Sequence, residues 1–191
     1  MGEKIAMGFH TCVDYELAWD TAVVEEQIRA YGIRSGELEV KTEADSERML
    51  WIECLAHLKA GVGGEIVPAS PEICEDFAEK FRYRITLGGT ATRAAIALDR
   101  MGYRSVLQTS CYNQYVERLM PAGIRVLPGV DRDHCRVYPH VVLQCQAGVR
   151  IHAGDIDFTT PRENRILITR DLDSLNIPVL DQAFGELLTD A

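Results

Sequence analysis

The fold is decided by residues 82–110, RYRITLGGTATRAAIALDRMGYRSVLQTS. The alternating run RYRITL is typical of a β-strand. A glycine pair, Gly88 and Gly89, then leads into an Ala-rich stretch that we expect to form a helix ending at Gly102. The apolar run SVLQTS follows as a buried strand. Strand, helix and strand in this order predict a βαβ unit, and hence an α/β fold with a partly parallel sheet.

The chain before this stretch is expected to alternate strands and helices. Residues 4–10 are predicted to be the first strand, which continues through TCVDYELAW toward a ligand-facing turn. Helices are predicted over residues 20–32, with Asp20 as N-cap, within residues 44–64, and from Pro71 onward. A short extended piece, EIVPA, separates the last two helices.

The chain after this stretch has a different pattern. Four short β-runs, IRVLPG, RVYPHVVLQCQ, GVRIHAG and NRILITRD, follow one another with turns between them. A run of strands inside an α/β chain predicts a separate sheet or a lid. The last residues, PVLDQAFGELLTDA, are expected to form a helix.

Composition and charge exclude several classes of partner. The 191 residues suffice for one good core, or for one domain with a smaller appendage. The net charge of −9 repels a phosphate backbone and argues against nucleic acid. No apolar stretch approaches the roughly 20 residues that cross a bilayer, and the start lacks the apolar core of a signal peptide. We therefore expect a cytoplasmic protein without a membrane partner, whose six scattered cysteines are reduced and mostly buried.

Two positions are candidates for binding a small polar ligand. Gly88 and Gly89 lie between a strand and a helix, where backbone N–H groups suit sugar hydroxyls or a phosphate. The alternative is a tight turn that only packs the helix on the sheet. Asp14 ends an apolar strand at the expected carboxyl edge of the sheet, where its carboxylate could accept hydrogen bonds from two vicinal hydroxyls. The alternative is a solvated Asp that starts a turn.

Other polar residues give weaker signals. Glu65 follows the glycine-rich run AGVGG, although a surface loop is the commoner setting for such a Glu. The segment PRENRIL offers the guanidinium groups of Arg162 and Arg165 for a phosphate, or simply a polar strand edge. His134 beside Cys135 is the nearest approach to a metal site, but a second ligand pair at zinc spacing is missing, so we predict no metal ligands in this chain.

The order of five motifs gives these features more weight. TCVDYE, GGEIVP, LGGTATRAAIALDRMGYRSVLQT, YPHVVLQCQAG and PRENRILITRD together resemble the ADP-dependent glucokinases and phosphofructokinases of the ribokinase-like superfamily. The resemblance spans nearly the whole chain. It implies a large α/β domain with a smaller β-rich lid, and transfer of the β-phosphate of ADP to a sugar hydroxyl with the aid of Mg²⁺.

The resemblance also implies roles for individual residues. Asp14 and Glu65 would bind sugar hydroxyls, and Gly88, Gly89 and Thr90 would line the sugar pocket. Arg165, and less directly Arg162, would contact the phosphates of the nucleotide. Self-association is expected through the lid or through the edge of an incomplete sheet.

The sequence departs from the family pattern in three respects. Cys12 stands where the family has Asn, and Thr90 stands where it has Asn or Gln, so the preference for glucose or fructose 6-phosphate is not carried over. The third departure is length, because family members are more than twice as long. The Gly-x-Gly-Asp segment with the catalytic Asp and the Asn-x-x-Glu segment that helps place Mg²⁺ do not occur in these 191 residues. The sequence is therefore interpreted as the N-terminal portion of a kinase, incomplete C-terminally and inactive alone, with no catalytic residue and its Mg²⁺ ligands outside this chain.

The expected organisation has five parts. They are the start of the large domain (1–32), a lid insertion with helices (33–85), a βαβ unit of the large domain or lid junction (86–123), a β-rich lid segment (124–175) and a helix that returns to the large domain (176–191). Two other functions stay open: an ATP-dependent ribokinase-like kinase, and a non-catalytic sugar-binding protein descended from a kinase.

Overall fold

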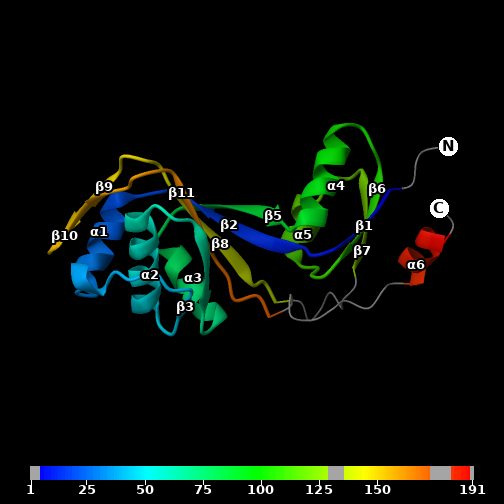
Figure 1. Ribbon diagram of the computed structural model, residues 1–191. Helices are drawn as coiled ribbons and strands as arrows, with labels where there is room; N and C mark the ends of the chain where they lie inside the picture. The colour runs from blue at the N-terminus through cyan, green and yellow to red at the C-terminus, as the bar shows by residue number, and fades with distance from the viewer. Residues whose placement is uncertain (1–4, 129–135, 173–181, 190–191) are drawn as a thin grey trace. The chain divides into compact units, whose positions relative to one another are not determined.

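The computed structural model describes residues 5–128, 136–172 and 182–189, which form two compact units (Figure 1). Unit 1 comprises Met1–Asp14, Ile85–Tyr138 and Asp171–Ala191. Unit 2 comprises Tyr15–Arg84 and Pro139–Arg170. None of the described helices is long and apolar enough to cross a membrane.

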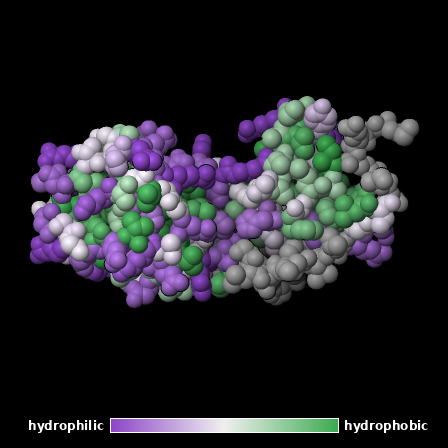
Figure 2. All heavy atoms as spheres, viewed as in Figure 1, coloured by the Kyte–Doolittle hydropathy of each residue, from purple (hydrophilic) through white to green (hydrophobic). Residues whose placement is uncertain are grey.

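Unit 1 is built on a parallel sheet of three strands. The order is β1 (Ile5–Phe9), β6 (Ser105–Thr109) and β7 (Ile124–Pro128). The helix α4 (Thr90–Arg100) packs on this sheet, where Ala95, Leu107 and Ile124 form a small core. Figure 2 shows hydrophobic side chains gathered over α4, as expected for an Ala-rich helix. Two further helices, α5 (Gln114–Leu119) and α6 (Gln182–Thr189), complete the unit.

Unit 2 contains most of a mixed sheet of six strands. The order is β3 (Glu43–Ala44), β4 (Gly64–Pro68), β11 (Asn164–Ile168), β8 (Pro139–Cys145), β2 (Cys12–Leu17) and β5 (Tyr83–Gly88). The strand β2 begins in unit 1 and ends in unit 2, whereas β5 begins in unit 2 and ends in unit 1. The strands β9 (Arg150–Ala153) and β10 (Ile156–Thr159) form a separate antiparallel hairpin.

Three helices of unit 2 pack against its strands. The helices α2 (Glu47–Ala60) and α3 (Pro71–Glu79) contact the six-stranded sheet, and α1 (Thr21–Ala30) contacts β9 of the hairpin. Their largest buried side chains, Trp51 and Phe77, have ring centroids 4.4 Å apart and share one core with Ile66, Leu143 and Ile166 of the sheet. The opposite face of the sheet carries the alternate residues of the same strands.

Local signals explain where the helices begin and end. The Asp20 carboxylate accepts from the N–H groups of Ala22 and Val23, which confirms the predicted N-cap. The Ser46 hydroxyl caps α2, and Pro71 is the first residue of α3 as expected. Gly61 ends α2 at a φ of 67°, a left-handed conformation that glycine adopts without strain.

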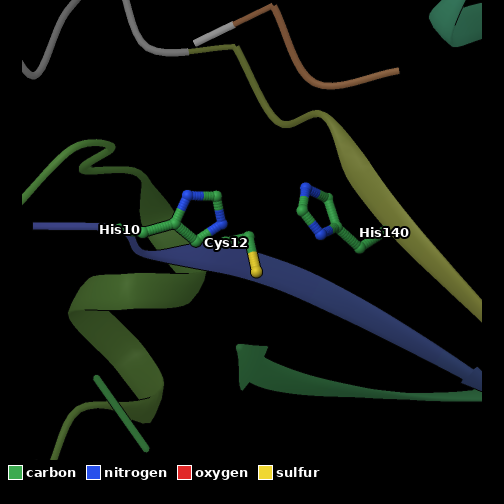
Figure 3. A group of neighbouring side chains, drawn as sticks. All are labelled: His10, Cys12 and His140. Atoms are coloured by element: carbon green, nitrogen blue, oxygen red, sulfur yellow. The ribbon is translucent and has the colours of Figure 1, made fainter. Parts of the chain in front are cut away.

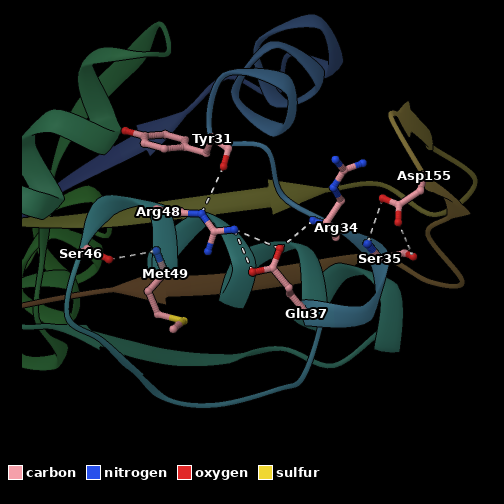
Figure 4. Close-up of polar contacts among 8 residues, drawn as sticks. All are labelled: Tyr31, Arg34, Ser35, Glu37, Ser46, Arg48, Met49 and Asp155. Carbon is pink, nitrogen blue, oxygen red and sulfur yellow. Dashed lines mark hydrogen bonds and ion pairs between the residues drawn. The ribbon is translucent and has the colours of Figure 1, made fainter.

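A polar cluster connects the segment after α1 with α2 and the β9–β10 hairpin (Figure 4). Arg48 donates to the Tyr31 carbonyl at 3.1 Å and to both carboxylate oxygens of Glu37 at 2.8 and 3.0 Å. Ser35, in the short 3₁₀ helix η1 (Ser35–Glu37), donates to the Asp155 carboxylate through its N–H and its hydroxyl. These contacts fix an otherwise irregular connection within unit 2.

The predicted βαβ unit needs correction. The strands β5 and β6 that flank α4 belong to different sheets, because β5 is the neighbour of β2 whereas β6 lies between β1 and β7. The parallel arrangement exists, but its strands are β1, β6 and β7. Local periodicity identified each strand and could not identify its partner.

The compact units also divide the chain differently from the five expected parts. The boundary expected near residue 85 lies one residue away from the observed one. The helix α1 belongs to unit 2 because it packs on β9, and β7 belongs to unit 1 because it pairs with β6. The short elements β3, β10 and α5 have no counterpart among the predicted elements. The helix expected at the C-terminal end is observed over Gln182–Thr189, and the residues before it lie outside the described ones.

Candidate functional site

Asp14 lies in unit 1 with its carboxylate almost entirely buried. It is the third residue of β2, which runs on to Leu17, so Asp14 does not end a strand as the sequence suggested. Only 5% of the residue is exposed. Arg93 donates from Nη2 to Asp14 Oδ2 at 2.6 Å, and the Cys12 thiol donates to Oδ1 at 3.3 Å. A buried carboxylate needs such partners, since an uncompensated charge inside a protein is costly.

Gly88 is required by the packing of this carboxylate. A Cβ atom at Gly88 would lie 2.5 Å from Cys12 Sγ and would overlap Asp14 Oδ1. Gly89 is required by the backbone. Its φ is 90°, and a Cβ there would overlap the His10 carbonyl oxygen. The glycine pair therefore lets β5 and α4 approach the segment that carries Asp14, and the two predicted features form one cluster.

The start of α4 is held against the same segment by hydroxyl groups. The side-chain oxygens of Thr11 and Thr92 are 2.8 Å apart, and both residues are buried. The Thr11 N–H donates to the Ser110 hydroxyl at 3.0 Å. Figure 3 shows two side chains of this segment, His10 and Cys12. Thr90, the first residue of α4, is exposed at this end of the helix.

Cys12 is a poor nucleophile in this setting. Burial, and then the neighbouring Asp14 carboxylate, raise the pKa of the Cys12 thiol far above its usual range. The thiol therefore stays protonated and serves as a hydrogen-bond donor to Asp14. The other described cysteines, at positions 54, 74, 111 and 145, are also buried, as the sequence predicted. Cys135 and His134, the nearest approach to a metal motif, lie outside the described residues.

Glu65 lies in unit 2, on the face of the sheet opposite the helices. It is the second residue of β4 and is exposed. It pairs with Leu167 of β11, whereas its neighbour Ile66 points into the helix-covered core. Thr169 donates from its hydroxyl to Glu65 Oε1 at 2.9 Å, and Thr169 is 8% exposed. The carboxylate of Glu65 is thus exposed but held in place by a buried hydroxyl.

Arg165 lies on the same face of this sheet. It pairs with Gln144 of β8 and is two residues before Leu167, so its side chain shares the face of Glu65. Both Arg165 and Gln144 are exposed. Arg162 precedes the strand, where its side chain packs beside Gly61 at the end of α2. The structure therefore places Arg165 on the strand β11 and Arg162 at the turn that precedes it.

Asn164 has a structural role that the sequence did not suggest. Its amide donates to the carbonyl oxygens of His57 at 3.1 Å and of Val62 at 2.8 Å, and only 4% of the residue is exposed. These contacts tie the PRENRIL segment to the end of α2 and to the glycine-rich loop that follows. Asn164 thereby fixes the start of β11, from which Arg165 projects.

Three residues that hold the candidate site residues or their segments in place were not predicted: Arg93, Thr92 and Thr169. A weak signal existed for Arg93, because it lies close after the glycine pair and three arginines flank that pair. Thr92 and Thr169 carry no local signal, since their partners are 81 and 104 residues away in the chain.

Comparison with solved structures supports the fold. The chain is similar to a hypothetical ADP-dependent phosphofructokinase from Pyrococcus horikoshii OT3, with a TM-score of 0.69 and 17% identity over 88% of this chain and 41% of that one. A phosphofructokinase from the same organism with AMP gives a TM-score of 0.65 and 14% identity, with 87% of this chain and 42% of that chain covered. The last common ancestor of ADP-dependent phosphofructokinases from Methanosarcinales gives 0.62 and 14%, with 88% and 38% covered. These likenesses establish the α/β, ribokinase-like fold of part of such kinases.

The chain spans about two fifths of the length of these structures, namely 41%, 42% and 38%. No curated protein matches the sequence. The sequence profile of the ADP-specific phosphofructokinase/glucokinase conserved region matches residues 3–189, which is nearly the whole chain. The chain therefore belongs to the ADP-specific phosphofructokinase/glucokinase family.

Proposed function

We propose that the whole protein transfers a phosphoryl group from ADP to a sugar or a sugar phosphate, and that this chain supplies the sugar side of the site. The observation that carries the proposal is the buried Asp14 carboxylate, held by Arg93 beside Gly88. A carboxylate has about four lone-pair positions, so Asp14 can accept sugar hydroxyls in addition to its contacts with Arg93 and Cys12. Glucose and fructose 6-phosphate represent the substrate class.

Within unit 1, Asp14 would orient the acceptor hydroxyls. The Gly88–Gly89 turn would admit the sugar ring close to the backbone, and the exposed hydroxyl of Thr90 could contact it. Such contacts lower the barrier of phosphoryl transfer mainly by positioning, because that reaction needs little covalent chemistry from the protein.

Within unit 2, Glu65 is the candidate for a second sugar contact. Its carboxylate is exposed and is steadied by Thr169. Arg165 is the candidate for contact with the nucleotide phosphates, since a guanidinium group matches the geometry of phosphate oxygens. Arg162 is the second candidate for that role.

The described residues do not suit a magnesium site. Mg²⁺ prefers carboxylate and phosphate oxygens in octahedral geometry, and no group of three carboxylates gathers within ligand distance in the described part of the chain. When bound with ADP, the ion would neutralise charge on the phosphates. The Gly-x-Gly-Asp pattern of the proton-accepting Asp does not occur in these 191 residues. We therefore expect this chain to bind sugar without phosphorylating it.

Two measurements test the proposal. Calorimetric titration of the 191-residue chain with D-glucose and D-fructose 6-phosphate should show saturable binding of at least one of them, and D14N should abolish it. A coupled assay of the same chain with ADP, Mg²⁺ and sugar should show no turnover. Sugar phosphorylation by the 191 residues would contradict the assignment of the base to another part of the protein. Absence of binding to any sugar would contradict the sugar-binding role.

One observation favours a second candidate, a non-catalytic sugar-binding protein. Cys12 offers Asp14 only a thiol and Thr90 offers only a hydroxyl, so the pocket has fewer polar groups than the family pattern predicts. Binding without turnover by the complete protein would favour this candidate. Turnover with ATP but not ADP would instead favour the ATP-dependent branch.

A further inference from the structure

The ion pair between Arg93 and Asp14 joins two parts of unit 1 that are 79 residues apart in sequence. Arg93 lies in the first turn of α4, and its N–H bonds to the Gly89 carbonyl at 2.9 Å. Its side chain is 51% exposed, whereas that of Asp14 is 7% exposed. The guanidinium group thus reaches from the surface to a carboxylate that is almost fully enclosed.

Two contacts fix the position of Arg93 relative to Asp14. Gly89 lies so close to the His10 carbonyl that no side chain fits between them. Thr92, adjacent to Arg93, is completely buried and lies 2.8 Å from the Thr11 hydroxyl. The backbone of the first helical turn is therefore anchored to the segment that leads into Asp14, and the ion pair does not depend on a flexible loop.

We propose that Arg93 is a positioning residue, which holds the Asp14 carboxylate in the orientation that binds the acceptor sugar; this inference rests on the proposed sugar-binding role of Asp14. Arg93 engages Oδ2 and the Cys12 thiol engages Oδ1, so both oxygens are fixed before a ligand arrives. A carboxylate that is already oriented loses less conformational entropy when it binds hydroxyls. Without Arg93, the Cys12 thiol still engages Oδ1, but Oδ2 loses its charged donor and the orientation of the carboxylate is less well fixed.

The contact predicts how substitutions at Arg93 behave. R93M retains much of the aliphatic stem and removes the charge. The Kd for sugar should rise about tenfold, as the loss of a charge-assisted hydrogen bond to a buried carboxylate allows. Only one guanidinium nitrogen, Nη2, is within hydrogen-bond distance of Asp14, so a lysine ammonium can replace it. R93K should therefore bind sugar within about threefold of the wild-type chain, a difference below 1 kcal/mol. The matched control is R100M, which removes an exposed arginine from the other end of the same helix.

The test is calorimetric titration of the wild-type chain, R93M, R93K and R100M with D-glucose and D-fructose 6-phosphate, with the melting temperature of each variant recorded. The expected result is weaker binding by R93M, recovery in R93K, no change in R100M, and the same loss for neutral and phosphorylated sugar. A lower melting temperature with unchanged affinity in R93M would assign Arg93 a structural role only and overturn the inference.

Other results are equally decisive. Tighter binding by R93M would mean that Arg93 competes with the sugar for Asp14. A much larger loss for fructose 6-phosphate than for glucose would mean that Arg93 contacts the phosphate itself. Failure of the wild-type chain to bind any sugar would overturn the proposed function and this inference together, whereas binding by the wild-type chain with equal binding by R93M overturns the inference alone.

Discussion

Replacing Gly88 by alanine tests the packing on which the candidate site depends. The added Cβ would lie 2.5 Å from Cys12 Sγ and closer still to Asp14 Oδ1, whereas ordinary van der Waals contact begins near 3.4 Å. The carboxylate must therefore move by about 1 Å, since the thiol and the carboxylate are both enclosed and neither can leave without disturbing its neighbours. That displacement also breaks the 2.6 Å contact between Asp14 and Arg93.

Two magnitudes follow from this displacement. Overpacking of a well-packed site destabilises a protein by about 1–3 kcal/mol, so G88A should lower the free energy of unfolding by roughly that amount. A misplacement of about 1 Å in a positioned group costs on the order of 100-fold in function, so the Kd of G88A for sugar should rise about 100-fold. The loss of affinity should exceed that of R93M, because R93M leaves Asp14 where it is.

Urea unfolding and calorimetric titration measure the two effects separately. The matched control is G185A, a glycine-to-alanine change in α6 of the same unit, where an added Cβ meets nothing within 4 Å. G185A should be neutral or stabilising by up to about 1 kcal/mol, because alanine favours helix more than glycine does. If G88A unfolded at the same urea concentration as the wild-type chain and bound sugar within about threefold, the close packing of Gly88 against Asp14 and Cys12 would be refuted.

Three further predictions concern stability within unit 2. N164A should lower the free energy of unfolding by about 1–3 kcal/mol, because the Val62 carbonyl loses its amide donor and the His57 carbonyl loses one of three donors. Urea unfolding beside the exposed control E163A would detect the loss, and a change below about 0.5 kcal/mol would contradict the role given to Asn164. D20A should cost about 1 kcal/mol through loss of the α1 N-cap, measured in the same way, and no loss would show that the cap is dispensable. Burial raises the pKa of Glu53 above its ordinary value of 4.5, so its favourable contribution is complete below that pH and is lost as the pH rises through the raised pKa. The stability of E53Q relative to the wild-type chain should therefore increase from pH 4.5 toward neutrality, and a difference independent of pH would show that the Glu53 carboxyl is not responsible.

The sequence indicated the candidate residues one by one, without showing which of them lie together. Asp14 and the glycine pair were each recognised as candidates, and the structure brings them together as one cluster, with Gly88 packed directly on the Asp14 carboxylate. The residues that hold this cluster were not recognised as such. The sequence around Thr92 is that of an ordinary threonine in the first turn of a helix. Only the structure shows that its side-chain oxygen lies 2.8 Å from that of Thr11. In unit 2, the sequence indicated the arginines of PRENRIL as candidates for binding phosphate, whereas the residue that fixes the segment is Asn164.

The sequence by itself determined the elements whose signals are local. Asp20, Ser46 and Pro71 mark the starts of helices because capping and fixed backbone angles act within three residues. Ile66 follows Glu65, and Ile166 likewise follows an arginine. The apolar member of each pair faces the core, since successive side chains point to opposite faces.

Only the tertiary structure decided which strands and side chains meet. It placed β5 beside β2 and β6 between β1 and β7, although β5 and β6 flank the same helix in the sequence. It also joined Arg93 to Asp14 across 79 residues and Thr169 to Glu65 across 104. The physical reason is that hydrogen bonds between strands and between buried side chains depend on the packing of the whole unit. A local pattern of apolar and polar residues does not specify which distant residue will be the partner.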